Sequence, residues 1–193
     1  MASLNEILRF NKEFVEQKQY VPYITDKFPN KKIVILTCMD TRLIELLPKA
    51  MNLRNGDAKI IKSAGAMVAH PFGGIMRSIL VAVYELQADE VYVIGHHDCG
   101  MSRVDPHHMI EHMKQRGVSQ EIIKSIKYSG IDLVEWLRGF GDVEKNVLNS
   151  VDIIRNHPLF PKSTPVHGLI MHPETGKLDL LTNGHEYLKQ QSE

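Results

Sequence analysis

The sequence contains little cysteine, no excess of charge of either sign and no long apolar run. Only 2 of its 193 residues are cysteine, which excludes a small fold held together by several disulfides. Lysine plus arginine number 23, and aspartate plus glutamate also number 23. Since no basic block is present either, we expect no nucleic-acid partner. The apolar runs are shorter than the ~20 residues that a membrane-spanning helix needs, so we expect no membrane partner.

The remaining composition is that of a globular protein. With 43% hydrophobic and 24% charged residues, a chain of this length buries a substantial core without disulfides. We therefore expect residues 1–193 to form a single domain. The first residues lack the basic start and apolar segment of a secretory signal, so we expect a cytoplasmic protein. In a reducing compartment the two cysteines favour metal ligation, with a single disulfide as the alternative.

The first half of the chain alternates short β-branched runs with amphipathic segments. Strands are predicted over residues 32–37, 58–63 and 90–95, and helices over 43–50 and 73–86. This alternation is typical of an α/β fold, in which right-handed crossovers place the strands parallel to one another. We therefore predict a mainly parallel central sheet flanked by helices.

Both ends of the chain add elements to this sheet. Residues 105–156 are predicted to be helical, with breaks at glycines. Residues 166–171 and 178–181 are predicted strands around a tight turn, so they form a C-terminal hairpin at one sheet edge. A capping box at the N-terminus starts a helix with one broad apolar stripe. Because this helix precedes the first strand, we predict that residues 1–25 form a helical arm that packs on a partner subunit.

Each cysteine lies in a short cluster that directly follows a predicted strand. Cys38 follows the first of these strands, and His96 and Cys99 follow the third. In an open parallel sheet, ligand-binding side chains gather at the carboxyl ends of the strands. Two thiolates and one imidazole form a soft set of three ligands, which suits Zn²⁺ and leaves its fourth position open. We therefore predict a catalytic zinc site made by Cys38, His96 and Cys99.

Asp40 and Arg42 follow Cys38 at alternate positions. If strand geometry continues past Cys38, alternation places all three side chains on a common side. Asp40 can then accept a hydrogen bond from the zinc-activated nucleophile, while Arg42 holds the carboxylate by a bidentate pair. The alternative is an ordinary surface ion pair, which contributes little.

The pattern Cys38-x-Asp40-x-Arg42 followed by His96-x-x-Cys99 resembles the beta-class carbonic anhydrases. The resemblance implies that Cys38, His96 and Cys99 bind zinc and that Asp40 and Arg42 form the catalytic dyad. It also includes a closed state in which Asp40 is the fourth zinc ligand. The implied enzyme is a carbonate dehydratase, which hydrates carbon dioxide reversibly to bicarbonate and a proton. The implied assembly is a homodimer or higher homo-oligomer.

The resemblance covers most of the chain from residue 31 to residue 181, and two segments depart from it. Lys62-Ser63 stands where relatives often carry an Arg-Asn pair, and residues 70–74 differ from the usual loop. These departures leave two alternatives open. One is a carbon disulfide or carbonyl sulfide hydrolase of the same fold, and the other is a non-catalytic zinc protein with a closed pocket.

Overall fold

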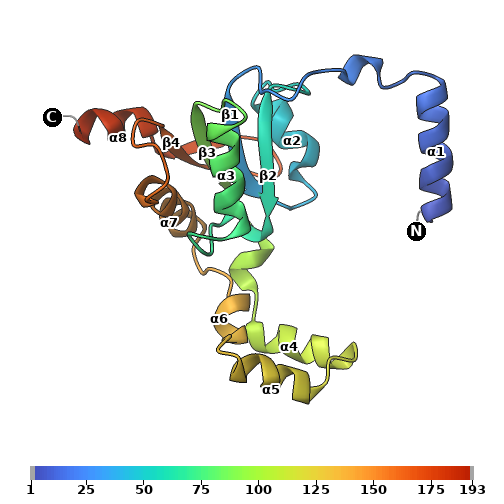
Figure 1. Ribbon diagram of the computed structural model, residues 1–193, viewed down its shortest axis with the longest axis vertical. Helices are drawn as coiled ribbons and strands as arrows, with labels where there is room; N and C mark the ends of the chain where they lie inside the picture. The colour runs from blue at the N-terminus through green and yellow to red at the C-terminus, as the bar shows by residue number, and fades with distance from the viewer. Residues whose placement is uncertain (1–2, 192–193) are drawn as a thin grey trace.

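A computed structural model describes residues 3–191 of the chain (Figure 1). The strands are β1 (Ile33–Cys38), β2 (Ala58–Ser63), β3 (Glu90–His96), β4 (Val166–Met171) and β5 (Leu178–Thr182). The helices are α1 (Leu4–Glu16), α2 (Leu43–Ala50), α3 (Gly74–Tyr84), α4 (Pro106–Gln115), α5 (Gln120–Tyr128), α6 (Leu133–Leu137), α7 (Val143–Asn156) and α8 (Gly184–Gln191). Short 3-10 turns lie at Val21–Tyr23, Ala64–Ala66 and Gly100–Arg103.

The five strands form one sheet in the order β2-β1-β3-β4-β5. Strands β1 to β4 are parallel, whereas β5 runs antiparallel to β4 at the edge. This architecture confirms the predicted α/β class, the flanking helices and the C-terminal edge hairpin. Strand β1 lies inside the sheet and all six of its residues are buried, which explains why it reads as a continuous apolar run.

The two faces of the sheet are covered by different helices. Because side chains alternate along a strand, Val34 and Leu36 pack with α3 and α7, whereas Ile33 and Ile35 pack with α2. Helix α7 lies especially close to β3 near its end. A Cβ added at Gly95 would lie 2.7 Å from Val147 Cγ2, so a side chain at this position would push α7 away from the strand.

The predicted helical segments occur with small shifts in their ends. The capping box is present, since Ser3 Oγ accepts a hydrogen bond from the backbone of Glu6 and the Glu6 carboxylate accepts one from Ser3. The region 105–156 forms α4, α5, α6 and α7, with Gly117 and Gly130 at two of the breaks. Both glycines have positive φ, which residues with a Cβ rarely adopt.

Helix α1 stands apart from the sheet of its own chain (Figure 1). None of its described residues is buried, and its apolar stripe is exposed, with Leu4 70% and Phe10 63% accessible. Helices α4, α5 and α6 also project from the sheet and lie below it in this view (Figure 1). Within the described part of the chain, none of the helices combines the length and apolar character that crossing a membrane requires.

Candidate metal centre

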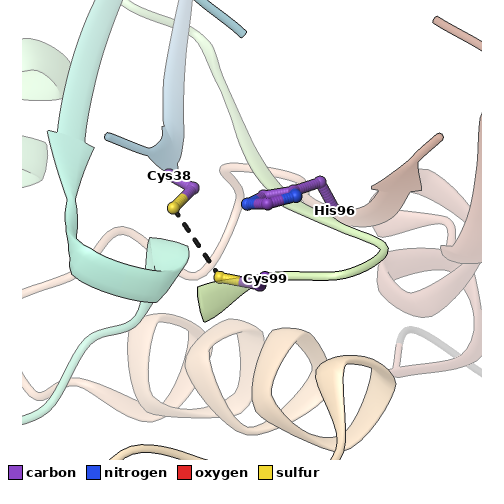
Figure 2. A group of neighbouring side chains, drawn as sticks. All are labelled: Cys38, His96 and Cys99. Atoms are coloured by element: carbon purple, nitrogen blue, oxygen red, sulfur yellow. Dashed lines mark hydrogen bonds between the residues drawn. The ribbon is translucent and has the colours of Figure 1, made fainter. Parts of the chain in front are cut away.

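The three predicted zinc ligands meet at the carboxyl edge of the sheet. Cys38 is the last residue of β1, His96 is the last residue of β3, and Cys99 follows in the next loop. Because β1 and β3 are parallel neighbours, their ends lie side by side. The two sulfurs and an imidazole nitrogen lie within 4.8 Å of one another, and all three residues are buried (Figure 2).

The spacing of the two sulfurs fits a shared metal ion. Both cysteines are free, and Cys38 Sγ lies 3.8 Å from Cys99 Sγ. Two sulfurs bound at ~2.3 Å to one tetrahedral zinc would be ~3.8 Å apart, whereas the sulfurs of a disulfide are only ~2.05 Å apart. The arrangement therefore favours metal ligation over the alternative of a disulfide.

His96 presents the correct nitrogen to the two sulfurs. Its Nδ1 lies 2.8 Å from the backbone oxygen of His97. A carbonyl oxygen only accepts hydrogen bonds, so Nδ1 must carry the proton and the neutral ring has a free lone pair on Nε2. This Nε2 is buried and has no hydrogen-bond partner. A buried nitrogen with a free lone pair is what a metal ion needs from a histidine.

The surroundings of the two thiols favour a thiolate at Cys38. The Cys99 thiol donates to Cys38 Sγ, and this hydrogen bond outweighs the effect of burial and lowers the pKa of Cys38 to about 4. The pKa of Cys99 is raised, because its proton bonds to the Cys38 thiolate and burial disfavours a second negative charge. A divalent cation between the sulfurs would offset the two negative charges and so stabilise both thiolates.

Asp40 and Arg42 lie beside the three candidate ligands. Arg42 Nε donates to Asp40 Oδ1 at 3.0 Å and Nη2 donates to Oδ2 at 2.8 Å. This guanidinium lowers the pKa of Asp40 to about 2. Asp40 Oδ2 also lies 3.7 Å from His96 Nε2, and only 18% of the Asp40 side chain is exposed. The pair is therefore part of the cluster rather than an ordinary surface ion pair.

The expected reason for this pairing was wrong. Strand geometry does not continue past Cys38, since β1 ends there and α2 begins at Leu43. The chain instead turns, and the backbone N–H of Arg42 donates to Asp40 Oδ1 at 2.9 Å. This turn, and not the alternation of a strand, brings the guanidinium onto the carboxylate. Both oxygens of the Asp40 carboxylate therefore accept hydrogen bonds from Arg42.

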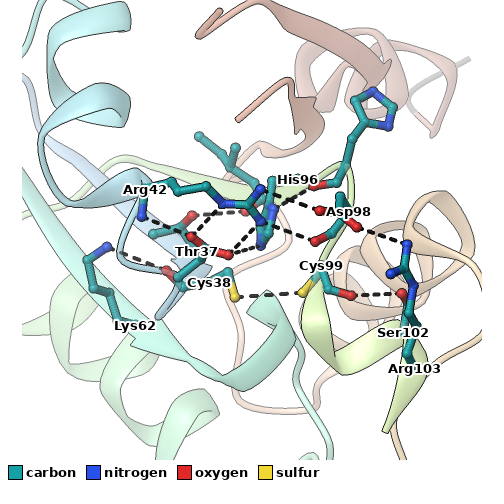
Figure 3. Close-up of polar contacts among 12 residues, drawn as sticks. Thr37, Cys38, Arg42, Lys62, His96, Asp98, Cys99, Ser102 and Arg103 are labelled. Atoms are coloured by element: carbon teal, nitrogen blue, oxygen red, sulfur yellow. Dashed lines mark hydrogen bonds and ion pairs between the residues drawn. The ribbon is translucent and has the colours of Figure 1, made fainter. Parts of the chain in front are cut away.

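Asp98 is a polar residue of the cluster that sequence reasoning missed. Its backbone oxygen accepts from Arg42 Nη2 at 3.1 Å, and its Oδ1 accepts from Arg103 Nη2 at 2.9 Å (Figure 3). Asp98 thus holds the far side of the Arg42 guanidinium. Asp98 lies between two predicted ligands, His96 and Cys99, and this position in the sequence could have suggested the contact.

A second group of metal-ligand side chains lies at the opposite end of β3. Glu90, His167 and His185 place their ligand atoms within 4.8 Å of one another. His167 Nδ1 accepts a hydrogen bond from the backbone N–H of Gly184 at 3.1 Å. The neutral ring must then carry its proton on Nε2, which lies 3.2 Å from Glu90 Oε2. A protonated nitrogen cannot bind a metal, so this group suits a proton better than a cation.

Comparison with known proteins gives the family. A family model described as "Carbonic anhydrase" matches residues 33–178. The Bacillus subtilis protein named "Putative carbonic anhydrase YtiB" is 64% identical over 185 residues, which cover 96% of this chain and 99% of that protein. A carbon disulfide hydrolase of Saccharolobus solfataricus is more distant, with 29% identity over 163 residues and 78% of each chain covered.

A solved structure agrees with this result. The beta-carbonic anhydrase isoform I of Trichomonas vaginalis superposes with a TM-score of 0.85 and 36% sequence identity. The match covers 95% of this chain and 100% of that one. The strand order agrees with these similarities, and so does the carboxyl edge of the sheet, which carries two cysteines and one histidine. The chain therefore belongs to the beta-carbonic anhydrase family.

Proposed function

We propose that Cys38, His96 and Cys99 bind zinc and that the protein is a carbonate dehydratase. It would hydrate carbon dioxide reversibly to bicarbonate and a proton. The observation that carries the proposal is the convergence of two buried thiols and one unprotonated imidazole nitrogen beside an arginine-held carboxylate. Membership of the carbonic anhydrase family supports the choice of reaction.

Zinc bound by these residues would supply a nucleophile, because it lowers the pKa of water from ~15.7 toward neutrality. The chain offers three ligands and so leaves the fourth coordination position open to the substrate side. Two thiolates offset the charge of the ion more than neutral imidazoles do. We therefore expect weaker acidification of water than at a three-histidine site, and an activity that rises toward alkaline pH.

Asp40 and Arg42 orient the nucleophile in this proposal. Asp40 is ionised throughout the neutral range, because Arg42 lowers its pKa to about 2. Its carboxylate can accept a hydrogen bond from the attacking group and turn that group's lone pair toward carbon dioxide. Arg42 is itself fixed by the Asp98 carbonyl. If Arg42 turned away, Asp40 would be free to fill the fourth zinc position and close the site.

The proposal is tested by stopped-flow hydration of carbon dioxide on zinc-loaded protein across the range from mildly acidic to alkaline pH. We expect catalysis that scales with zinc content and increases with pH. Hydrolysis of carbon disulfide or carbonyl sulfide, measured on the same preparation, would identify the alternative enzyme if it exceeded carbon dioxide hydration. A full zinc load without activity on any of the three substrates would instead indicate a non-catalytic zinc protein.

We also propose that residues 1–193 act as one domain whose first 25 residues form a dimerisation arm. The exposed apolar stripe of α1, with Leu8 57% and Phe10 63% accessible, supports this role. Exposed apolar patches mark interaction sites, and a second copy of the chain would remove this stripe from water. Deleting residues 1–25 should convert a dimer to a monomer in sedimentation analysis. A deletion variant that sediments as the full-length protein does would show that the arm is not the interface.

The two free cysteines bear on where the protein acts. Thiolate ligands persist most readily in a reducing compartment, where disulfides are rare. We propose a cytoplasmic location on this basis.

A further inference from the structure

A cavity of about 280 Å³ lies between the C-terminal end of α7, the chain that follows it and helix α8. Its lining includes Arg155, Phe160, Lys162, Thr164 and Tyr187. The lining also includes Val166, the first residue of β4, whereas His96 pairs with Met171 at the other end of that strand. The span from Val166 to Met171 is about 16 Å along the strand. The cavity is therefore separate from the candidate metal centre.

Arg155 brings to this cavity a positive charge that forms no ion pair with residues 3–191. Its Nη2 donates to two uncharged acceptors, the backbone oxygen of Val166 at 2.5 Å and Thr182 Oγ1 at 3.2 Å. Its Nε is buried and has no hydrogen-bond partner in the described part of the chain. The Tyr187 ring covers the guanidinium, with its centroid 4.1 Å from Cζ. Burial lowers the pKa of Arg155, but an arginine stays protonated in proteins, so the charge is only partly compensated.

Lys162 and Thr164 add donors to the lining, and no acidic side chain of the described residues opposes them. Lys162 Nζ donates to the backbone oxygen of Arg155 at 2.8 Å, and an ammonium group has two further protons to donate. Asp152, whose charge raises the pKa of Arg155, does not line the cavity. The charges in the lining are therefore all positive, which favours an anion.

The remaining walls restrict what kind of anion fits. Phe160, Pro161 and Leu188 give the cavity apolar surface, and apolar walls with few polar groups are typical of sites for small organic ligands. Helix α7 ends at Asn156, and the carbonyl groups of a helix C-terminus carry partial negative charge. This partial charge disfavours a dianion such as phosphate. The volume lies near the lower end of the range for ligand sites, which begins at ~300 Å³, so the ligand is small.

We propose that this cavity binds a small monocarboxylate with an apolar body. The carboxylate accepts hydrogen bonds from Arg155 and Lys162, which gives the guanidinium the anionic partner that the described chain does not supply. The apolar body lies against Phe160 and Leu188 and leaves water. This site is additional to carbon dioxide hydration and does not depend on it, so either proposal can fail alone.

The test titrates benzoate into the full-length protein in the presence of zinc and follows the backbone amide signals by NMR. Because a carboxylate also binds zinc, the signals that move identify which site is occupied. We expect saturable shifts in residues 155–166 and 184–191. Benzamide has nearly the same shape but no charge, and we expect it to bind at least about 10-fold more weakly.

Variants of single cations separate a built site from general attraction of charge. We expect Arg155→Gln to weaken benzoate binding by about 100-fold and Lys162→Gln by about 10-fold, because each removes a charged donor from the cavity. Lys189→Gln is the matched control. It removes the same charge from α8, but Lys189 does not line the cavity, so this variant should bind benzoate as the parent does. If Arg155→Gln does not fold, the comparison of Lys162→Gln with Lys189→Gln decides.

Three results would overturn the proposal. The first is an absence of saturable shifts, or shifts confined to the surroundings of Cys38, His96 and Cys99. The second is equal weakening by Lys162→Gln and Lys189→Gln, which would indicate only attraction to the overall charge. The third is inorganic phosphate that binds at the same residues as tightly as benzoate, which would contradict the assignment to a monocarboxylate.

Discussion

Strand β3 begins at Glu90 and ends at His96, and a cluster of metal-ligand side chains lies at each end. Both clusters contain a buried histidine, and in both the ligand atoms lie within 4.8 Å of one another. They differ in the backbone group that contacts Nδ1. At His96 this group is a carbonyl oxygen, which leaves Nε2 free, whereas at His167 it is an N–H, which places the proton on Nε2.

The difference shows that one backbone contact can decide whether a histidine binds a metal or a proton. At the His167 end, the Glu90 carboxylate already accepts from the Tyr92 hydroxyl at 2.8 Å and faces both imidazoles. Burial lowers the pKa of His167, despite the nearby carboxylate. This end of β3 is thus a proton-bearing cluster that joins β3, β4 and α8, while the other end is the candidate metal centre.

The largest effect is expected when the two histidines are replaced in the same way. His96→Gln should lose essentially all bound zinc and all hydration activity, because only two thiolates would remain at the site. His167→Gln should retain one zinc per chain and most of the activity. Zinc is measured by mass spectrometry of the metal in purified protein whose fold is verified by circular dichroism. Loss of zinc from His167→Gln, with His96→Gln still loaded, would reverse the assignment.

The carboxylates of Asp40 and Glu90, which lie in the clusters at the two ends of β3, provide the second comparison. Asp40→Asn should reduce the rate of carbon dioxide hydration by about 100-fold or more, because it removes the acceptor that orients the nucleophile, while zinc content stays at the parent level. Glu90→Gln should leave the rate near that of the parent and lower thermal stability instead, because Tyr92 and two imidazoles lose a charged partner. A fall of zinc in step with activity in Asp40→Asn would mean that Asp40 is needed to hold the metal.

The smallest effect concerns the pH dependence of stability at the His167 end. Because burial lowers the pKa of His167 in the folded chain, the unfolded chain takes up this proton first as pH falls below about 6.5. The folded state therefore loses stability as pH falls from there toward the lower folded pKa, by at most about 1.4 kcal/mol per pH unit for one proton. Above that window His167 contributes no dependence on pH.

This effect is measured by denaturant unfolding of the zinc-loaded parent and of His167→Gln at pH 7.5 and pH 5.5. The parent should lose more unfolding free energy on acidification than the variant does, since the variant lacks the titrating group. Any release of zinc affects both proteins and so cancels in the comparison. An equal or larger loss in the variant would contradict the protonation state inferred for His167.

The sequence allowed the candidate ligands to be predicted because of where they occur. Cys38 and His96 each end a continuous apolar run, and buried parallel strands must place such residues at one edge of the sheet. The exposed apolar stripe of α1 was also foreseeable, since the helix precedes every strand that could cover it. In these cases local pattern and topology were sufficient.

Other features depend on contacts that a sequence pattern does not contain. The Asp40–Arg42 pair forms through a turn that ends β1, and the sequence alone does not give the residue at which a strand stops. The contact of Arg155 with Val166 depends on how α7 packs across the sheet. The protonation of His96 and His167 depends on two backbone groups, from His97 and Gly184, whose places are set only by the folded chain.

The most direct test of the account is X-ray absorption at the zinc edge of the purified, zinc-loaded protein. Ligation by Cys38, His96 and Cys99 predicts two sulfur neighbours at ~2.3 Å and one imidazole nitrogen at ~2.0–2.1 Å in the first shell. One zinc per chain is expected. A shell that contains only nitrogen and oxygen, as Glu90, His167 and His185 would give, would contradict the account.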